Sequence, residues 1–376
     1  MKFLNKYTLL LLGILVIGLV TLNIIIPSFQ TEEFSQEVID DIIEGVSTTT
    51  VVPLDAENTT VEEIITNKEE ELIITEEEEN KIEQLLINNN PDKEITDFDV
   101  YMLIGSDERQ GEAIETRGKV DGKRADVIIL GLINKESQKT TLLSFPRDLL
   151  IINNCTKKIE RINASYSKND CGNSAENLAA AIYSISGLKV NHFASFEFNG
   201  FESIIDSVGG VEICVDRTQK EGYSFELQQG CQIVNGLTTL NWVVSRSTEV
   251  LVGEKTIDSE GKDNSTWELM TGVSDLTRIN RQQYVVTQLI KELGQFNSIN
   301  ELNSLVKALE EAFIIDENLT LNKAVELLWT LRDFDLTKVD KLITPIDYVT
   351  LDDGRQVLVL KEKIYDYLSR NSIINS

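Results

Sequence analysis

The chain has 376 residues, a formal net charge of -27 and a sequence pI of about 4.4. It lacks the basic surface with which proteins hold a nucleic-acid backbone, so no nucleic-acid partner is expected. The single histidine, His192, nearly excludes zinc sites made of several histidines and weakens any Ser-His-Asp interpretation. It falls in an expected strand, and we interpret it as a packed structural residue.

A long uncharged segment lies near the start of the chain. Thr8 to Ile26 contains nineteen residues without a charge, enough for a helix to span about 30 Å of hydrocarbon. Lysines precede it, acidic residues follow it, and its end lacks an Ala-x-Ala cleavage pattern. Residues 1–27 are therefore predicted to be a cytoplasmic N-terminus and a single-pass signal-anchor transmembrane helix, with the remainder outside the cell membrane. A cleaved signal, the alternative, would give the same location without the anchor.

The next segment, 28–97, carries most of the acidic excess, with 21 Asp and Glu against 3 Lys. This composition predicts an extracytoplasmic spacer with short helices and no chemistry. The rest of the chain is only mildly acidic, which leaves room for a local cationic pocket.

Residues 98–376 alternate between strand-like and helix-like patterns, which predicts an α/β domain with a central mixed sheet flanked by helices in layers. Expected strands are 100–104, 127–130, 140–143, 191–196 and 211–215, with a hairpin at 348–351 and 356–360. Expected helices are 174–186, capped by Ser174, and 201–208, 302–313, 321–334 and 364–368.

The second and third of these strands form a two-strand unit with charged residues at one end. Arg124 and Asp126 stand just before the first of the pair, and Arg147 and Asp148 stand just after the second. In a hairpin these positions meet at the same end of the sheet. Guanidinium groups bind oxyanions and carboxylates hold divalent metals, so the cluster suits a phosphate substrate with a metal ion. The alternative is a pair of surface salt bridges, which contribute little.

A second cationic group falls on a predicted helix that begins at Asp275. Helical spacing places Arg278, Arg281 and Gln282 on one face. Two arginines in a first turn oppose the helix dipole, which suggests an anionic ligand. A solvated charged face is the alternative.

Four cysteines allow three pairings, and none of them forms a CxxC motif. The sequence-near set, Cys155–Cys171 with Cys214–Cys231, would close two short loops in an oxidising compartment. Each closure would stabilise the fold by roughly 3 kcal/mol on the chain-entropy estimate. Four free buried thiols are the alternative.

Six motifs occur in order along about 98–293 of the chain. They are Gly-Ser-Asp-x-Arg at 105–109, Arg-x-Asp at 124–126, Ser-x-Pro-Arg-Asp at 144–148, Arg-Ile-Asn-Ala-x-Tyr at 161–166, Val-Gly-Gly-Val at 208–211 and Asp-x-x-Arg-x-x-Arg-Gln-Gln at 275–283. This ordered set, with the anchor, resembles the LytR-CpsA-Psr family of bacterial cell-wall enzymes.

The resemblance implies a Mg2+-dependent phosphotransferase. Such an enzyme moves a glycopolymer, for example teichoic acid or capsule, from a polyprenyl diphosphate carrier to peptidoglycan, and can also act as a polyprenyl diphosphate pyrophosphatase. Carried over, Asp107 and Asp126 would hold the metal and, with Arg147 and Asp275, form the catalytic set. The substrate-binding residues would be Arg124, Arg246, Arg278, Arg281, Gln282 and Asn163.

One departure supports a different class of function. Val244 stands where the family usually has an arginine. This favours, as the alternative, a non-catalytic polyprenyl-phosphate or cell-wall binding protein. A membrane-bound transcriptional attenuator is a third interpretation, against which the acidic, extracytoplasmic domain argues.

Overall fold

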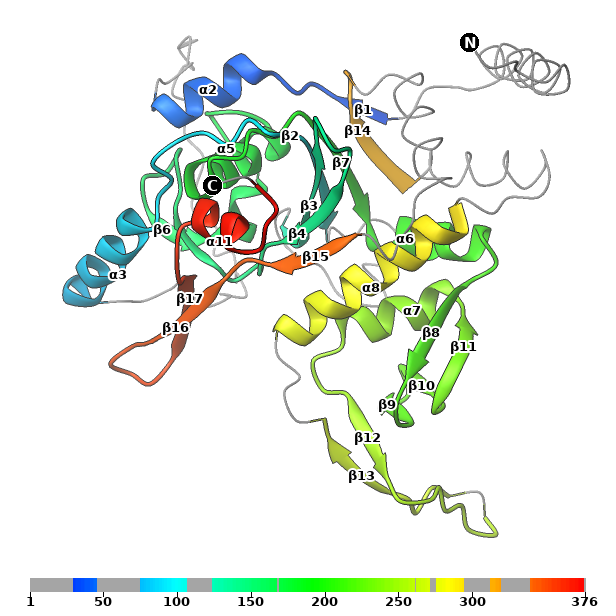
Figure 1. Ribbon diagram of the computed structural model, residues 1–376. Coiled ribbons are helices and arrows are strands. Elements are labelled where there is room, and N and C mark those ends of the chain that lie inside the picture. Colours follow the sequence, from blue (N-terminus) through cyan, green and yellow to red (C-terminus); the bar gives the residue numbers. More distant parts are fainter. Residues whose placement is uncertain are drawn as a thin grey trace, which may run out of the picture.

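A seven-stranded mixed sheet forms the centre of the fold, in the order β1-β14-β7-β2-β3-β4-β15 (Figure 1). The computed structural model describes residues 30–45, 75–106, 124–167, 169–260, 262–270, 275–293, 312–318 and 339–374. The strands of this sheet are β1 (Gln30–Glu32), β2 (Phe98–Ser106), β3 (Ala125–Asn134), β4 (Thr140–Ser144), β7 (His192–Glu197), β14 (Phe313–Asp316) and β15 (Asp340–Ile343). Antiparallel β2-β3-β4 pairing and parallel β2-β7 and β4-β15 pairing confirm the predicted mixed α/β sheet.

Helices cover both faces of the sheet, which explains the continuous apolar runs in its strands. On one face, Ile128 and Leu130 of β3 pack into the main core with α2 (Gln36–Glu44), α5 (Ser174–Ser186) and α11 (Ile364–Arg370). On the other face, Val127 and Ile129 form a smaller cluster with Val286 of α8 (Asp275–Leu293). Alternating side chains of one strand therefore stabilise two layers.

The start of α5 is a capping box that also fixes α2. The cap is Asn173, one residue before the predicted Ser174. Its side chain accepts a hydrogen bond from the Glu176 amide at 2.9 Å, and the Glu176 carboxylate accepts one from the Asn173 amide at 3.0 Å. The same carboxylate accepts a bond from the Ser35 amide, directly before α2, at 2.9 Å. Gly187 ends α5 with a φ of 72°, a left-handed conformation that favours glycine.

The described parts of 28–97 belong to the folded domain, which corrects the prediction of a spacer. Phe34, Ile39 and Ile42 lie in the main core around α2. Ile82 and Leu86 of α3 (Glu76–Asn88) pack with residues of β5 (Leu150–Ile152) and β17 (Gln356–Leu360). Within the helices, Ile39 and Ile42 are three residues apart and Ile82 and Leu86 four apart, so each pair forms one apolar stripe, which the average acidic composition conceals.

Several predicted elements fall partly or wholly outside the described residues. These are the anchor at 8–26, the helix 321–334 and nearly all of the helix 302–313, whose expected last residue, Phe313, instead begins β14. None of the helices among the described residues is long and apolar enough to cross a membrane. At the C-terminal end, β16 (Ile346–Thr350) pairs with β17 and α11 follows, as predicted.

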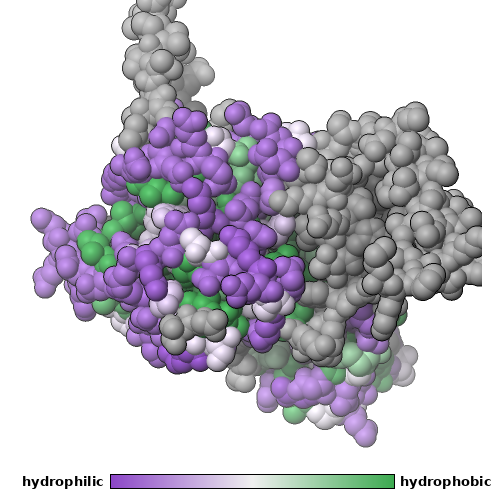
Figure 2. Space-filling view, turned by 45° about the horizontal axis from the view of Figure 1, so that its top comes forward, coloured by the Kyte–Doolittle hydropathy of each residue, from purple (hydrophilic) through white to green (hydrophobic). Residues whose placement is uncertain are grey.

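A smaller lobe adjoins α8. Its helices are α6 (Phe198–Ser207) and α7 (Gly236–Val244), and a two-stranded antiparallel sheet pairs β8 (Val211–Val215) with β11 (Gly230–Val234). A four-stranded sheet completes it in the order β10 (Phe225–Leu227), β9 (Gln219–Glu221), β12 (Glu249–Val252) and β13 (Thr266–Leu269). Over the described residues, the face in Figure 2 is mostly hydrophilic with separate apolar patches, consistent with the acidic composition.

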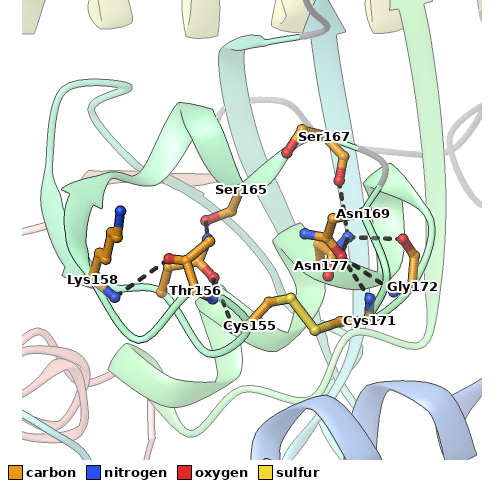
Figure 3. The surroundings of a disulfide bond; sticks show 10 residues. Cys155, Thr156, Lys158, Ser165, Ser167, Asn169, Cys171, Gly172 and Asn177 are labelled. Carbon is orange, nitrogen blue, oxygen red and sulfur yellow. Dashed lines mark hydrogen bonds between the residues drawn. A yellow bond between two sulfur atoms is a disulfide. The ribbon is translucent and has the colours of Figure 1, made fainter. Parts of the chain in front are cut away.

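Both sequence-near disulfides, Cys155–Cys171 and Cys214–Cys231, are present. The first ties the segment after β5 to the loop before α5 (Figure 3). Asn177 of α5 donates from its side-chain amide to the carbonyl oxygens of Ser167 and Gly172, each at 2.9 Å. The second joins opposed residues of β8 and β11. The crosslinks therefore stabilise one loop in each lobe.

These bonds predict a simple labelling result. In the denatured, unreduced protein a thiol reagent should label none of the four cysteines, and after reduction it should label all four. Intact-mass spectrometry would count the labels. Labelling of all four without reductant would contradict both disulfides, and labelling of two would contradict one of them.

Candidate functional site

An ion pair between Asp126 and Arg147 forms the centre of the candidate site. β3 and β4 pair with Ile129 opposite Ser144, and the Phe145 amide continues the ladder by donating to the Ile128 carbonyl at 3.0 Å. Two residues beyond Phe145 and Ile128, the same register places Arg147 opposite Asp126. Its Nη1 atom donates to the Asp126 Oδ1 atom at 2.5 Å. The predicted convergence of these two residues at one end of the hairpin is confirmed.

Asp126 occupies an irregularity in the sheet that the sequence pattern did not predict. Gly105 pairs with Val127, but Ser106 pairs with Ala125, so Asp126 is the extra residue of a β-bulge. A bulge bends its strand locally and redirects a side chain, and bulges occur often beside active sites. Ala125 is fully buried here, while the Asp126 side chain is 17% exposed.

The ion pair extends into a row of alternating charges. Arg147 Nε lies 3.4 Å from Asp148 Oδ2, and Arg161 Nε lies 3.5 Å from Asp148 Oδ1. Exposure of the side chains rises along the row, from 17% and 19% for Asp126 and Arg147 to 46% for Arg161. The inner pair is therefore partly shielded from water, where charge interactions are stronger than at an open surface. Arg161 was not among the predicted site residues, although its motif was noted.

Asn163 lies beside Arg147, as its predicted role requires. It belongs to the 3-10 helix η1 (Ile162–Ser165) and is buried. The Asn163 backbone amide donates to the Arg147 carbonyl at 3.2 Å, and the neighbouring Ile162 backbone amide donates to the Leu149 carbonyl at 2.8 Å. These bonds fix the backbone from which the Arg147 side chain extends.

The helix α8 is joined to the same end of the sheet through Gln283. Its side-chain amide donates to Ser144 Oγ and to the Leu342 carbonyl, each at 2.8 Å. Ser144 ends β4, three residues before Arg147, so one amide connects the helix to β4 and β15. Arg278 and Gln282, on the same helix, are buried. Gln283 was missed as a site residue, although it ends the motif at 275–283.

Arg281 makes internal contacts, in contrast to its predicted role as a substrate ligand. Its Nη1 atom donates to the Trp242 carbonyl and to Thr248 Oγ1, each at 2.9 Å, and its guanidinium lies 5.0 Å from the centre of the Trp242 ring. Burial lowers the pKa of Arg281 to about 10, which still leaves it charged at neutral pH. Arg281 therefore holds the end of α7 and the start of β12 against α8.

For the other predicted site residues, the structure gives the position in the chain and the exposure, or leaves them outside the described residues. Arg124 immediately precedes β3 and is partly exposed, and Arg246 is exposed between α7 and β12. Asp107 lies outside the described residues, and so does the side chain of Asp275, the first residue of α8. His192 is away from this cluster: it is buried, and its Nδ1 atom lies 3.2 Å from both carboxylate oxygens of Asp316. This agrees with its interpretation as a packed structural residue.

The donor atoms suit a magnesium ion that is shared with a phosphate ligand. Among the described residues, no group of three or more His, Cys, Asp and Glu side chains could hold a metal by itself. Mg2+ commonly binds through one or two carboxylates and completes its shell with waters and substrate phosphates. Asp126 supplies one such carboxylate at the arginine cluster, so the chemistry of this end of the sheet fits that mode.

Comparison with known proteins identifies the class. The chain belongs to the LytR-CpsA-Psr family, because the LytR_cpsA_psr family model matches residues 60–254 and 268–372. It is similar to the probable cell wall biosynthesis protein LcpB of Corynebacterium glutamicum, with 30% identity over 39% of this chain and 36% of that protein. It is also similar to a polyisoprenyl-teichoic acid–peptidoglycan teichoic acid transferase, TagU, of Bacillus licheniformis, with 23% identity over 61% and 62%.

Solved structures agree on the fold. A LytR-Csp2A-Psr enzyme from Actinomyces oris superimposes with a TM-score of 0.53 at 20% identity, covering 75% of this chain and 93% of that one. TagV of Bacillus subtilis gives 0.54 at 17% identity, covering 75% and 100%. Against the curated relatives, the chain spans only about a third to two thirds of their length.

Proposed function

We propose that this chain is a membrane-anchored, extracytoplasmic phosphotransferase that moves a glycopolymer from a polyprenyl diphosphate carrier to peptidoglycan. The observation that carries the proposal is the partly shielded Asp126–Arg147 pair at the end of the β3-β4 hairpin. Family membership and the naming of TagU as a teichoic acid transferase support it.

The reaction needs negative charge to be gathered and neutralised. The acceptor hydroxyl oxygen forms a bond to the phosphorus that carries the glycopolymer, and the bond from that phosphorus to the lipid phosphate breaks. The hydroxyl proton passes to a carboxylate of the site, and the polyprenyl phosphate leaves. Arg147, with Arg124, Arg246 and Arg278, binds the diphosphate oxygens through charge-assisted hydrogen bonds. Asp126 orients the Arg147 guanidinium through their ion pair.

Mg2+, held by Asp107 and Asp126, would supply further neutralisation of the phosphate oxygens. With water in place of the sugar hydroxyl, the same arrangement would give pyrophosphatase activity.

The proposal is tested by incubating the full chain with a polyprenyl diphosphate-linked glycopolymer, Mg2+ and peptidoglycan. The expected products are polymer covalently attached to peptidoglycan and an equal amount of polyprenyl phosphate. A non-catalytic binding protein, the second candidate, would retain the donor unchanged. That candidate is favoured by Val244, which packs against the apolar core of the smaller lobe and brings no cation to the site. Donor binding without carrier release would therefore replace the first proposal by the second.

The proposed location follows from the uncharged segment at 8–26 and the lysines before it. Protease added outside intact cells should remove the folded domain, while the short N-terminal segment stays protected inside. Immunoblotting with an epitope at each end of the chain would detect the removal of the folded domain and the protection of the N-terminal segment. A domain that is protected from external protease until the cells are lysed would overturn the location.

A further inference from the structure

The β12-β13 hairpin, with its tip at 253–265, extends from the smaller lobe beyond the rest of the fold, and we call it the ribbon (Figure 1). Most of the tip and the first two residues of β13 make up 255–267, the stretch between the two parts matched by the family model. The family match therefore covers β12 and the end of β13 but not residues 255–267 of the ribbon.

The base of the ribbon is fixed to α8. Thr248, directly before β12, accepts a hydrogen bond from Arg281 of α8 at 2.9 Å. Met270, directly after β13, contacts the same guanidinium through its sulfur atom at 3.7 Å. Arg246, a predicted diphosphate ligand, lies three residues before β12. The ribbon therefore starts next to the helix that Gln283 joins to the end of the central sheet.

The outer face of the ribbon combines apolar side chains with charged groups. Opposed residues of an antiparallel pair share a face, so Leu251 lies with Trp267 and Glu249 lies with Leu269 and Lys220. The Lys220 ammonium lies 3.8 Å from the centre of the Trp267 ring. Leu269 is 64% exposed, and Ile257 in the tip is 59% exposed. Of the eight large apolar side chains that are exposed in the described part of the chain, four lie on this sheet and its turns: Tyr223, Val252, Ile257 and Leu269.

Contacts across that face join the tip to β9, β10 and β13. Lys220 of β9 pairs with Asp263 at 3.4 Å, and Lys255 pairs with Glu226 of β10. The Trp267 indole donates to Asp263 at 3.1 Å. A surface that is already ordered loses less conformational entropy when it binds a partner.

Charge and position both argue against a lipid surface as the partner. Residues 249–269 carry six carboxylates against two lysines, which anionic headgroups would repel. The proposed anchor ends at Ile26 and β1 begins at Gln30, so the four Cα–Cα steps between them can separate β1 from the membrane by at most about 14 Å. In Figure 1 β1 and the ribbon lie at opposite ends of the molecule. The ribbon therefore points away from the membrane, toward the cell wall.

We propose, on the basis of the function proposed above, that the ribbon is a docking surface for the glycan strands of peptidoglycan and holds the acceptor near the site. Sugar rings present apolar C–H faces, which aromatic and aliphatic side chains cover, and hydroxyl and amide groups, which donate to carboxylates. The outer face offers both kinds of group in alternation: Leu251, Trp267 and Leu269 beside Glu249 and Asp263.

The test compares two matched double variants of the full chain in detergent. Ile257→Ser with Leu269→Ser removes two exposed apolar side chains from the ribbon. Ile87→Ser with Tyr348→Ser makes the same kind of change in α3 and β16, where these side chains are 46% and 48% exposed. The probe is peptidoglycan sacculi stripped of attached polymers, and the readout is the protein that sediments with them. We expect the ribbon variant to bind about tenfold more weakly and the control to bind like the wild type.

Three further results would overturn the proposal. They are equal binding of both variants, loss of wild-type self-association in the ribbon variant alone, and loss of binding to anionic vesicles in the ribbon variant alone. Donor turnover is followed in parallel by release of polyprenyl phosphate. If the wild type releases none, the proposed function fails, while the sedimentation result still decides whether the ribbon binds peptidoglycan. If the wild type releases polyprenyl phosphate and the ribbon variant binds sacculi more weakly, the KM of the ribbon variant for the acceptor should be about tenfold higher than that of the wild type. Its rate of donor hydrolysis should be unchanged.

Discussion

Replacing Arg147 by alanine should lower glycopolymer transfer by about 100-fold or more, the scale observed when one preorganised charge-stabilising donor is removed. Arg147 extends from the end of β4, and its fixed partner is Asp126 at 2.5 Å. The Arg147 side chain is 19% exposed, so its bonds to phosphate oxygens would form in a site partly shielded from water. The measurement is the initial rate of polymer attachment to peptidoglycan with the purified variant.

Two controls distinguish a site role from a structural one. Arg147→Lys keeps the charge but loses the forked geometry, so we expect an intermediate rate. Arg370→Ala removes an arginine of α11 that is 61% exposed and makes two bonds of 2.7 Å to Glu362, before that helix, and its transfer rate should match that of the wild type. All three variants should melt like the wild type. Unchanged transfer by Arg147→Ala would remove Arg147 from the site and, with it, most of the proposed mechanism.

The sequence predicted the structure best where the residues that pair are close together in the chain. The strands around Ile129 and Ser144 are apolar and separated by a short polar turn, so a hairpin was the simplest arrangement. A hairpin then requires that the residues flanking it at one end meet, and Asp126 and Arg147 do so. The sequence-near disulfides were predictable for a similar reason, because each closes a short loop within one lobe.

Features that depend on tertiary contacts were not predictable in the same way. Composition assigned the segment around α2 and α3 to a spacer because acidic residues are so frequent in it, although two apolar side chains of each helix are buried in the folded domain. The bulge at Asp126 arises from pairing with β2, which the isolated strand pattern does not contain. Helical spacing placed Arg278 and Arg281 on one face, but it could not show that Trp242 and Thr248 would occupy the Arg281 guanidinium.

Replacing Arg281 by alanine should lower the free energy of unfolding by about 3 kcal/mol, because a buried charged group that joins three elements is lost. Its guanidinium donates to the Trp242 carbonyl and to Thr248 Oγ1, each at 2.9 Å, and packs near the Trp242 ring. Alanine would leave the carbonyl without this donor and leave a cavity beside the ring. Urea denaturation followed by tryptophan fluorescence would measure the loss. It should be the same from pH 6 to pH 8, since a pKa of about 10 keeps Arg281 charged throughout that range.

A double-mutant cycle with Thr248→Val identifies the source of the loss. Thr248→Val alone should lower the free energy of unfolding by about 2 kcal/mol, because the hydroxyl loses its hydrogen bonds with Arg281 and Ser245 while the bond from Arg281 to Trp242 remains. In the Arg281→Ala protein, Thr248→Val should lower the free energy of unfolding by less than it does in the wild type, because the bond from Arg281 to Thr248 is already absent. A substrate ligand would behave differently: Arg281→Ala would then unfold like the wild type and bind the polyprenyl diphosphate donor more weakly. That combination would restore Arg281 to the substrate-binding residues, as its sequence motif predicted.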